Sequence, residues 1–305
     1  MPTLFLSHPD CEKHEMLPQH PESPARLRAI HEQLSKPEWD ARLRRLEAVE
    51  IRAPHFKNIH LDDYLNMLAE LKPGEGIARI DADTSVSKHS LRAARLAAGA
   101  GLQGVEAIMA GEYNSAFCAV RPPGHHAESA IGMGFCIFNS IALAAERALA
   151  LGAKRVAILD FDVHHGNGTV EIFQDRPEVL VCSSFQFPFY PGRYDQINRP
   201  NICLTPLAEG TSSSAFRTAI ESDWVPALAA HQPDVILVSA GFDAHAEDPL
   251  AGLLLGDSDF LWLSQFINDQ ASRICGRRVM AMLEGGYNTA ALARSVEQFL
   301  RGFPR

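Results

Sequence analysis

The hydrophobic pattern changes at about Ser115, and from there short apolar runs alternate with segments of helical spacing. The apolar runs are rich in Val, Ile and Leu and bounded by Gly, Pro or charged residues. They predict the strands SAFCAV, RVAILDFD, VLVCSS, NICLTPL, VILVSAG and RVMAMLEGG. Helical spacing predicts helices at IALAAERALALG, SAFRTAIESDWVPALAAHQ, SDFLWLSQFINDQASRIC and NTAALARSVEQFLRGF, the last capped by Asn288 or Thr289. This alternation predicts a predominantly parallel β-sheet with helices on both faces.

The first hundred residues show more helical and looped patterns, as in ESPARLRAIHEQL and SLRAARLAAGAGLQGVEAIMAG. The sequence contains no repeat, low-complexity segment or Gly/Ser-rich or Pro-rich linker between the two halves. We therefore expect residues 1–305 to form a single α/β domain.

Polar residues follow four of the predicted strands. They lie in the segments Arg121 to His126, Asp160 to His165, Ser239 to His245 and Glu284 to Asn288. Parallel sheets bind ligands beyond the carboxyl ends of their strands. One such segment alone would be an ordinary polar turn, but four that converge on one edge of a sheet predict an active site.

The spacing of three residues suggests a metal centre. Asp162 and His164, two apart in an extended segment, point to the same side, and Asp243 at another strand end completes the set. This set leaves coordination positions open for water and substrate, as catalytic sites do. A buried hydrogen-bond network without metal is the alternative. The ligand types favour Zn²⁺, although Fe²⁺, Mn²⁺ and Co²⁺ are compatible.

Hydrolysis also needs groups that accept and donate protons. The adjacent His125 and His126 supply both if their neighbours push their pKa values apart. Asp160 is the expected partner of one imidazole and Asn167 of the other, and a carboxylate favours the cationic form more than an amide does. Tyr287, in a Gly-Gly-Tyr turn, is a candidate donor to an oxyanion.

Composition and charge exclude several classes of function. The net charge is −9 and no Lys/Arg run occurs, so we expect no nucleic-acid partner. No apolar run has membrane-spanning length, and the start MPTLFLSHPD lacks the features of a secretory signal. The six cysteines are scattered without CxxC spacing, which is typical of reduced thiols. We expect a cytoplasmic protein without a membrane partner.

The polar segments carry a family resemblance. RPPGHHA, GMGFCIFN, LDFDVHHGNGT, SAGFDAH and LEGGYN resemble the signature blocks of the histone deacetylase superfamily, in the same order, and HPESPARL resembles its N-terminal loop motif. Class I members of the superfamily usually have Asp where this chain has Asn167. The chain therefore resembles class II and bacterial class II-like members. The resemblance implies the arginase/deacetylase fold and a deacetylase that acts on N-acylated amines, most simply acetyl-lysine.

The resemblance also implies roles for individual residues. It implies a Zn²⁺ site made of Asp162, His164 and Asp243, and a catalytic group made of His125, His126, Tyr287, Asp160 and Asn167. It further implies a structural K⁺ bound by groups of Asp160, Asp162, His164, Ser183 and Ser184. Phe185 stands where many relatives have His, close to this K⁺ site.

The substrate tunnel is expected to involve Gly134, Phe135, Tyr190 and Leu250, with Phe135 and Tyr190 as its aromatic walls. Leu250 follows Asp243 by seven residues and is expected at the rim, where relatives selective for polyamines have Glu. Leucine favours acetyl-lysine in a peptide or protein, while an acetylated polyamine or another small amide is the alternative substrate. The sequence neither requires nor excludes a homo-oligomer.

Two rival functions fit the sequence less well. A binuclear ureohydrolase needs Asp at the position of Gly166 and again at the position of His245. A non-catalytic acyl-group binding protein would be expected to lack a metal ligand, a catalytic His or the Tyr, and this chain has them all.

Overall fold

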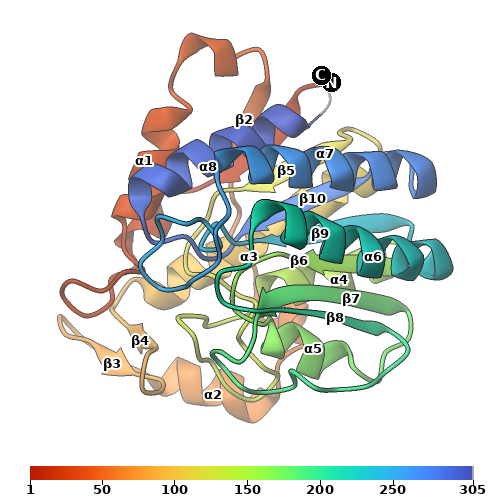
Figure 1. Cartoon of the computed structure of the whole chain (residues 1–305). Helices are drawn as coiled ribbons and strands as arrows, with labels where there is room; N and C mark the ends of the chain where they lie inside the picture. The colour runs from red at the N-terminus through yellow and green to blue at the C-terminus, as the bar shows by residue number, and fades with distance from the viewer. Residues whose placement is uncertain (304–305) are drawn as a thin grey trace.

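The computed structural model describes residues 1–303 and has one central eight-stranded sheet (Figure 1). All neighbouring strands of this sheet are parallel. In spatial order the strands are β2 (Leu43–Glu47), β1 (Thr3–Ser7), β5 (Ser115–Cys118), β10 (Val279–Leu283), β9 (Val235–Ala240), β6 (Val156–Asp160), β7 (Val179–Gln186) and β8 (Ile202–Leu207).

Helices form a layer on each face of the sheet (Figure 1). One layer packs against β5, β10, β9, β6 and β7 and consists of α3 (Ser90–Met109), α4 (Ser140–Ala150) and α5 (Asn167–Phe173). The helices of the other layer contact one another in the order α1 (Ala25–Gln33), α8 (Thr289–Gly302), α7 (Asp257–Ile274) and α6 (Ser213–His231). The predicted single α/β domain with a parallel sheet is confirmed.

Shorter elements complete the described chain. They are helix α2 (Asp62–Glu70), the antiparallel pair β3 (Ala78–Arg79) and β4 (Ser85–Val86), and the 3₁₀ segments η1 (Pro9–Lys13), η2 (Pro37–Trp39) and η3 (Ala53–Phe56).

The six predicted strands are confirmed as β5 to β10, and the four predicted helices after Ser115 as α4, α6, α7 and α8. Asn288 caps α8, since its side chain accepts a hydrogen bond from the N–H of Ala291. The first hundred residues are more helical and looped than the rest, as expected, but they also contribute two strands that the pattern did not predict, β1 and β2, which extend the sheet beyond β5. In β2 only Leu43 is buried, and charged side chains occupy most of its exposed positions, as is common on an edge strand.

The sheet order brings the four polar segments together. Strands β5, β10, β9 and β6 are consecutive neighbours, and all are parallel, so their carboxyl ends share one edge. All residues of these four strands are buried. Each polar segment therefore leaves a rigid, buried strand, which fixes the position of the groups that follow it.

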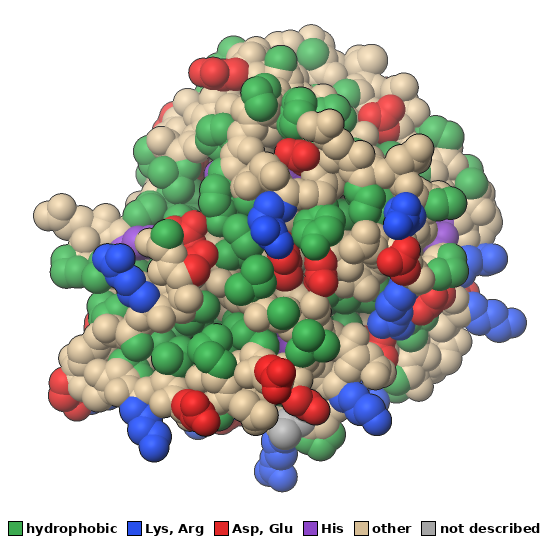
Figure 2. Space-filling view, turned by 90° about the horizontal axis from the view of Figure 1, so that it is seen from below, with side chains coloured by type: hydrophobic (Ala, Val, Ile, Leu, Met, Phe, Trp, Pro, Cys, Tyr) green, Lys and Arg blue, Asp and Glu red, His purple; other side chains and the backbone are tan. Residues whose placement is uncertain are grey.

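Within residues 1–303, none of the helices combines the length and the apolar character that crossing a bilayer requires. The six cysteines are all free thiols. On the face seen in Figure 2, the described Lys and Arg side chains are scattered among acidic and apolar ones and form no continuous basic patch.

Candidate active site

Three polar side chains meet at the carboxyl ends of β6 and β9. The Nδ1 atom of His164 lies 3.1 Å from Asp162 Oδ1 and 3.1 Å from Asp243 Oδ2. The ligand atoms of these residues all lie within 4.8 Å of one another, and all three side chains are buried. The structure thus brings together the three residues predicted to bind a metal.

Backbone N–H groups orient the two carboxylates. Gly285 donates to Asp162 Oδ2 at 2.8 Å, and Val163 donates to Asp243 Oδ1 at 2.9 Å. One oxygen of each carboxylate is thereby held, while the other points to His164. A Cβ atom at Gly241 would overlap Asp162 Oδ2, and one at Gly285 would overlap Asp243 Oδ2, so both positions need glycine.

The chemistry of this donor set fits a divalent cation. Burial raises the pKa of Asp243 to about 7, and the negative charge of Asp162 adds to the rise. Burial lowers the pKa of His164, but hydrogen bonds to Asp162 and Asp243 outweigh it and raise the value to about 10. Two buried carboxylates thus need positive charge beside them. A cation held by two oxygens and one imidazole nitrogen would supply it.

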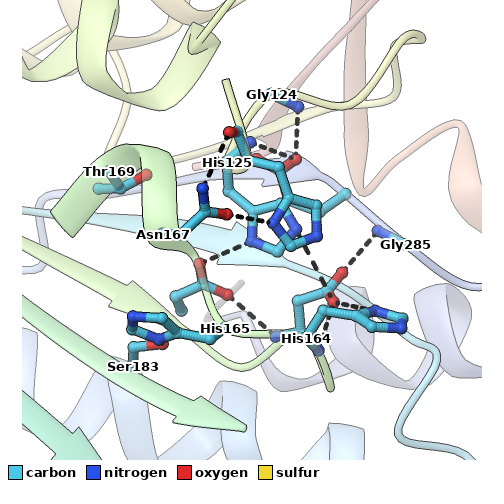
Figure 3. Close-up of polar contacts among 12 residues, drawn as sticks. Gly124, His125, His164, His165, Asn167, Thr169, Ser183 and Gly285 are labelled. Atoms are coloured by element: carbon cyan, nitrogen blue, oxygen red, sulfur yellow. Dashed lines mark hydrogen bonds and ion pairs between the residues drawn. The ribbon is translucent and has the colours of Figure 1, made fainter. Parts of the chain in front are cut away.

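The predicted histidine pair lies beside this cluster (Figure 3). His125 Nδ1 is 2.9 Å from Asp160 Oδ2, and His126 Nδ1 is 2.7 Å from Asn167 Oδ1, so both expected pairings occur. The ring centroids of the two histidines are 4.0 Å apart.

The two imidazoles have opposite electrostatics. Burial lowers the pKa of His125, but the charges of Asp160 and Asp162 outweigh it and hold this pKa well above its ordinary value. Burial and the positive charges of His125 and His164 hold the pKa of His126 well below its ordinary value. The pair therefore combines a cationic and a neutral imidazole, the separation expected of an acid–base pair.

Tyr287 is held from two sides. Asp248 Oδ2 accepts a hydrogen bond from its backbone N–H at 2.6 Å. The fully buried Arg26 donates to the carbonyl oxygens of Glu284 and Gly286, and its guanidinium lies 5.0 Å from the Tyr287 ring centroid. Burial raises the pKa of the Tyr287 hydroxyl well above its ordinary value, so this group stays a protonated donor.

The predicted aromatic walls both contact the site. The Phe135 ring lies edge-on to Tyr287, with centroids 5.8 Å apart, and the Tyr190 ring lies edge-on to His126 at 5.3 Å. Phe135 has a positive φ of 69°, and it follows Gly134, which also has a positive φ. A Cβ at Gly134 would overlap the His126 ring, which explains the glycine.

Leu250, expected at the rim, lies next to the turn that carries Tyr287. Its backbone N–H donates to Asp248 Oδ1 at 3.0 Å, while the other oxygen of this carboxylate binds the N–H of Tyr287. The Leu250 side chain is half-buried.

The residues of the expected K⁺ site are also neighbours. Asp160 and Ser183 are paired across β6 and β7, and the Ser184 hydroxyl donates to the Asp160 carbonyl at 3.4 Å. Phe185 packs on His165 with ring centroids 4.4 Å apart, and His165 Nδ1 lies 2.9 Å from Ser183 Oγ.

Sequence reasoning assigned no role to several residues that support the site. Glu284 Oε2 accepts hydrogen bonds from the backbone N–H groups of Gly124 and His125, and burial raises its pKa to about 7. Phe189, beside the expected Tyr190, stacks on the ring of His164 at 5.4 Å. The others are Arg26, Asp248 and Glu128, which binds Asn167. Arg26 lies in the motif HPESPARL, and Glu128 directly follows the motif RPPGHHA. Their place in or beside these motifs is the sequence feature that could have identified them.

Comparisons with known proteins agree with this geometry. Residues 20–303 match the model of the histone deacetylase domain. An uncharacterised protein of Synechocystis is 40% identical over 296 residues, which cover 95% of each chain. The histone deacetylase-like amidohydrolase of Pseudomonas aeruginosa is 36% identical, over 89% of this chain and 73% of that protein. The crystal structure of the HDA15 HD domain matches with a TM-score of 0.91 and 32% identity, over 100% of this chain and 91% of that chain. The resemblance expected from the sequence is thus confirmed, and the chain belongs to the histone deacetylase family of amidohydrolases.

Proposed function

We propose that this protein is a zinc-dependent deacetylase that hydrolyses the amide bond of N-acetylated amines, with acetyl-lysine as the preferred substrate. The observation that carries the proposal is the convergence of the polar segments that follow β5, β6 and β9. They place Asp162, His164 and Asp243 beside the histidine pair His125 and His126.

Zinc bound by Asp162, His164 and Asp243 would polarise the acyl carbonyl and lower the pKa of a water molecule. His126, the neutral imidazole, accepts the proton of the attacking water. His125 is kept cationic by Asp160 and stabilises negative charge or passes a proton to the leaving amine. The Tyr287 hydroxyl donates to the developing oxyanion. The amide C–N bond breaks, and acetate and a free amine leave.

The rim residues support acetyl-lysine over acetylated polyamines. Phe135 and Tyr190 offer aromatic surfaces to an aliphatic side chain. Leu250 is uncharged, so it offers apolar contact to lysine methylene groups but no attraction for a distant ammonium group.

A K⁺ ion near Asp160, Ser183 and Ser184 is part of the same proposal, because these residues supply closely spaced carboxylate, carbonyl and hydroxyl oxygens. We further propose that the enzyme works in the cytoplasm. Its six free thiols and its cyanobacterial and archaeal relatives support that location.

The proposal is tested by assaying the purified protein on acetyl-lysine peptides and acetylated polyamines side by side, with the bound metal measured in the same sample. Turnover of the peptides with bound zinc is expected. Absence of turnover on every acetylated amine would contradict the proposal.

A further inference from the structure

The side chain that orients His126 is an amide, and its oxygen end and its nitrogen end differ in hydrogen bonding. Asn167 Oδ1 lies 2.7 Å from His126 Nδ1. An amide oxygen only accepts hydrogen bonds, whereas the NH₂ group only donates. If the Asn167 amide turned over, it would donate to His126 Nδ1, and the proton of the imidazole would have to move to Nε2. The orientation of this amide therefore decides the tautomer of His126.

The surroundings of Asn167 fix that orientation. Its Nδ2 atom lies 2.8 Å from Glu128 Oε1, and it also faces the His126 carbonyl oxygen at 3.4 Å and Met133 Sδ at 3.5 Å. All three neighbours are acceptors, and a carboxylate is the strongest of them. The NH₂ group must therefore face Glu128, which leaves the amide oxygen toward His126.

The consequence for His126 follows from proton counting. Because Asn167 Oδ1 accepts, His126 Nδ1 must carry the proton of the neutral ring. The lone pair is then on Nε2, the ring nitrogen that Asn167 does not bind. An imidazole with this lone pair can accept a proton from water, and the other tautomer cannot do so at Nε2.

Glu128 is itself locked as a carboxylate acceptor. Arg193 binds it through two hydrogen bonds of 2.7 Å, one from Nε and one from the terminal NH₂. Glu128 is only 4% exposed, so this paired charge is held away from bulk water. Arg193 comes from the loop that also carries Tyr190, and it is itself exposed.

We propose that Glu128 is a positioning residue that acts through Asn167 to hold His126 in the tautomer with a free lone pair on Nε2. The inference rests on the proposed function for its effect on rate, but the tautomer itself can be observed without a substrate. It adds a carboxylate, and the arginine that holds it, to the groups that determine the state of His126.

Glu128→Leu is the first test. Leucine removes the acceptor, and the Asn167 NH₂ group then faces only the His126 carbonyl oxygen at 3.4 Å and Met133 Sδ at 3.5 Å, so the orientation of the amide is no longer fixed. We expect kcat to fall about 10–100-fold, the usual effect of removing a supporting partner of this kind, with KM nearly unchanged. Glu146→Leu is the matched control, since Glu146 also binds an arginine, Arg176, but contacts no residue of the site; its kcat should equal that of the wild type.

Glu128→Gln separates positioning from the ion pair with Arg193. A glutamine oxygen at the place of Glu128 Oε1 still accepts from Asn167 Nδ2 and Arg193 Nε, and only the second hydrogen bond of Arg193 is lost. We expect kcat to recover at least tenfold relative to Glu128→Leu. If Glu128 acted only through its charge on Arg193, the glutamine would not restore the rate, since it carries no charge.

Nitrogen-15 NMR of labelled histidine gives a readout that needs no turnover. The signals of His126 are assigned by their loss in His126→Ala. We expect protonated Nδ1 and unprotonated Nε2 in the wild type and in Glu128→Gln, and a mixture of tautomers in Glu128→Leu. Unchanged tautomer signals together with an unchanged kcat in Glu128→Leu would overturn the inference. Absence of deacetylase activity in the wild type, with these NMR differences present, would overturn only the proposed function.

Discussion

The proposed catalytic part of the site and its proposed rim are built differently. Asp162, His164, Asp243, His125 and His126 are all buried, and each side chain has hydrogen-bond partners. The rim residues Phe135, Tyr190 and Leu250 are half-buried and lie on loops. The groups proposed to act in catalysis are thus fixed by rigid strand ends, while the groups proposed to meet the substrate lie where substitution is easier. We expect changes in the first part to affect chemistry and changes in the second to affect selectivity.

The largest effect is expected for the three residues that hold the metal. Asp162→Ala, His164→Ala or Asp243→Ala should each lose bound metal and reduce turnover by about 10³-fold or more, because the group that polarises the carbonyl is lost. Elemental analysis and a peptide assay measure both quantities. Asp175→Asn is the control. Asp175 is exposed and forms an ion pair with Arg199 away from the site, so this substitution should change neither quantity. A triad variant that kept metal and rate would remove that residue from the metal site.

The next effect concerns Tyr287. Tyr287→Phe removes the hydroxyl but keeps the ring contacts with Phe135 and Arg26, so fold and metal content should stay normal. The rate should fall by about 10²–10³, as expected for one lost oxyanion donor. Tyr113→Phe, just before the amino end of β5 and therefore at the opposite edge of the sheet, is the control and should keep the wild-type rate. Near-native activity of Tyr287→Phe would mean that another group stabilises the oxyanion.

A third prediction concerns the stability of the fold around His125 and His126 at acidic pH. His60 Nε2 accepts from the Asn139 N–H at 2.9 Å and Nδ1 donates to the Glu128 carbonyl at 3.1 Å, so the ring must be neutral. Burial lowers the pKa of His60 to about 4, against about 6.5 in the unfolded chain. The folded state is therefore less able to bind this proton, and the stability that the neutral ring contributes is complete above pH 6.5 and is lost as the pH falls to 4.

Over that range the free energy of unfolding should drop by roughly 2–3 kcal/mol from His60 alone. Urea unfolding at pH 7.5 and pH 5 measures the change. His60→Gln cannot titrate, so its stability should depend less on pH than that of the wild type. An identical pH dependence of the two proteins would show that His60 is not the group responsible.

The smallest effect is expected at the rim. Leu250→Glu should shift the preference from acetyl-lysine toward acetylspermidine by about 1–2 kcal/mol, a partly screened ion-pair energy. The ratio of kcat/KM for the two substrates measures it. Leu254→Glu, at an exposed leucine 54% accessible to solvent, should leave the ratio unchanged. If the wild type already prefers polyamines to every peptide tested, the interpretation of Leu250 fails while the metal site is unaffected.

The sequence predicted the catalytic part better than its supports. Strands β5 to β10 are apolar runs with clear boundaries, and their polar ends identified Asp162, His164 and Asp243. Strand β2 was not predicted because its sequence, LRRLE, is mostly charged and lacks the apolar run that marks the other strands. The role of Arg26 was missed because its partner, the Gly286 carbonyl, lies 260 residues away in the chain. A buried charge whose partner is that distant has the same local pattern as an ordinary surface residue.

Metal removal and reconstitution tests the central claim most directly. The purified enzyme is stripped with a chelator, and Zn²⁺ is added back in steps while turnover of an acetyl-lysine peptide is followed. We expect no turnover in the stripped protein and a linear recovery that ends at about one equivalent of zinc, since one cluster of two carboxylates and one imidazole holds it. Full turnover in the metal-free protein would contradict the account.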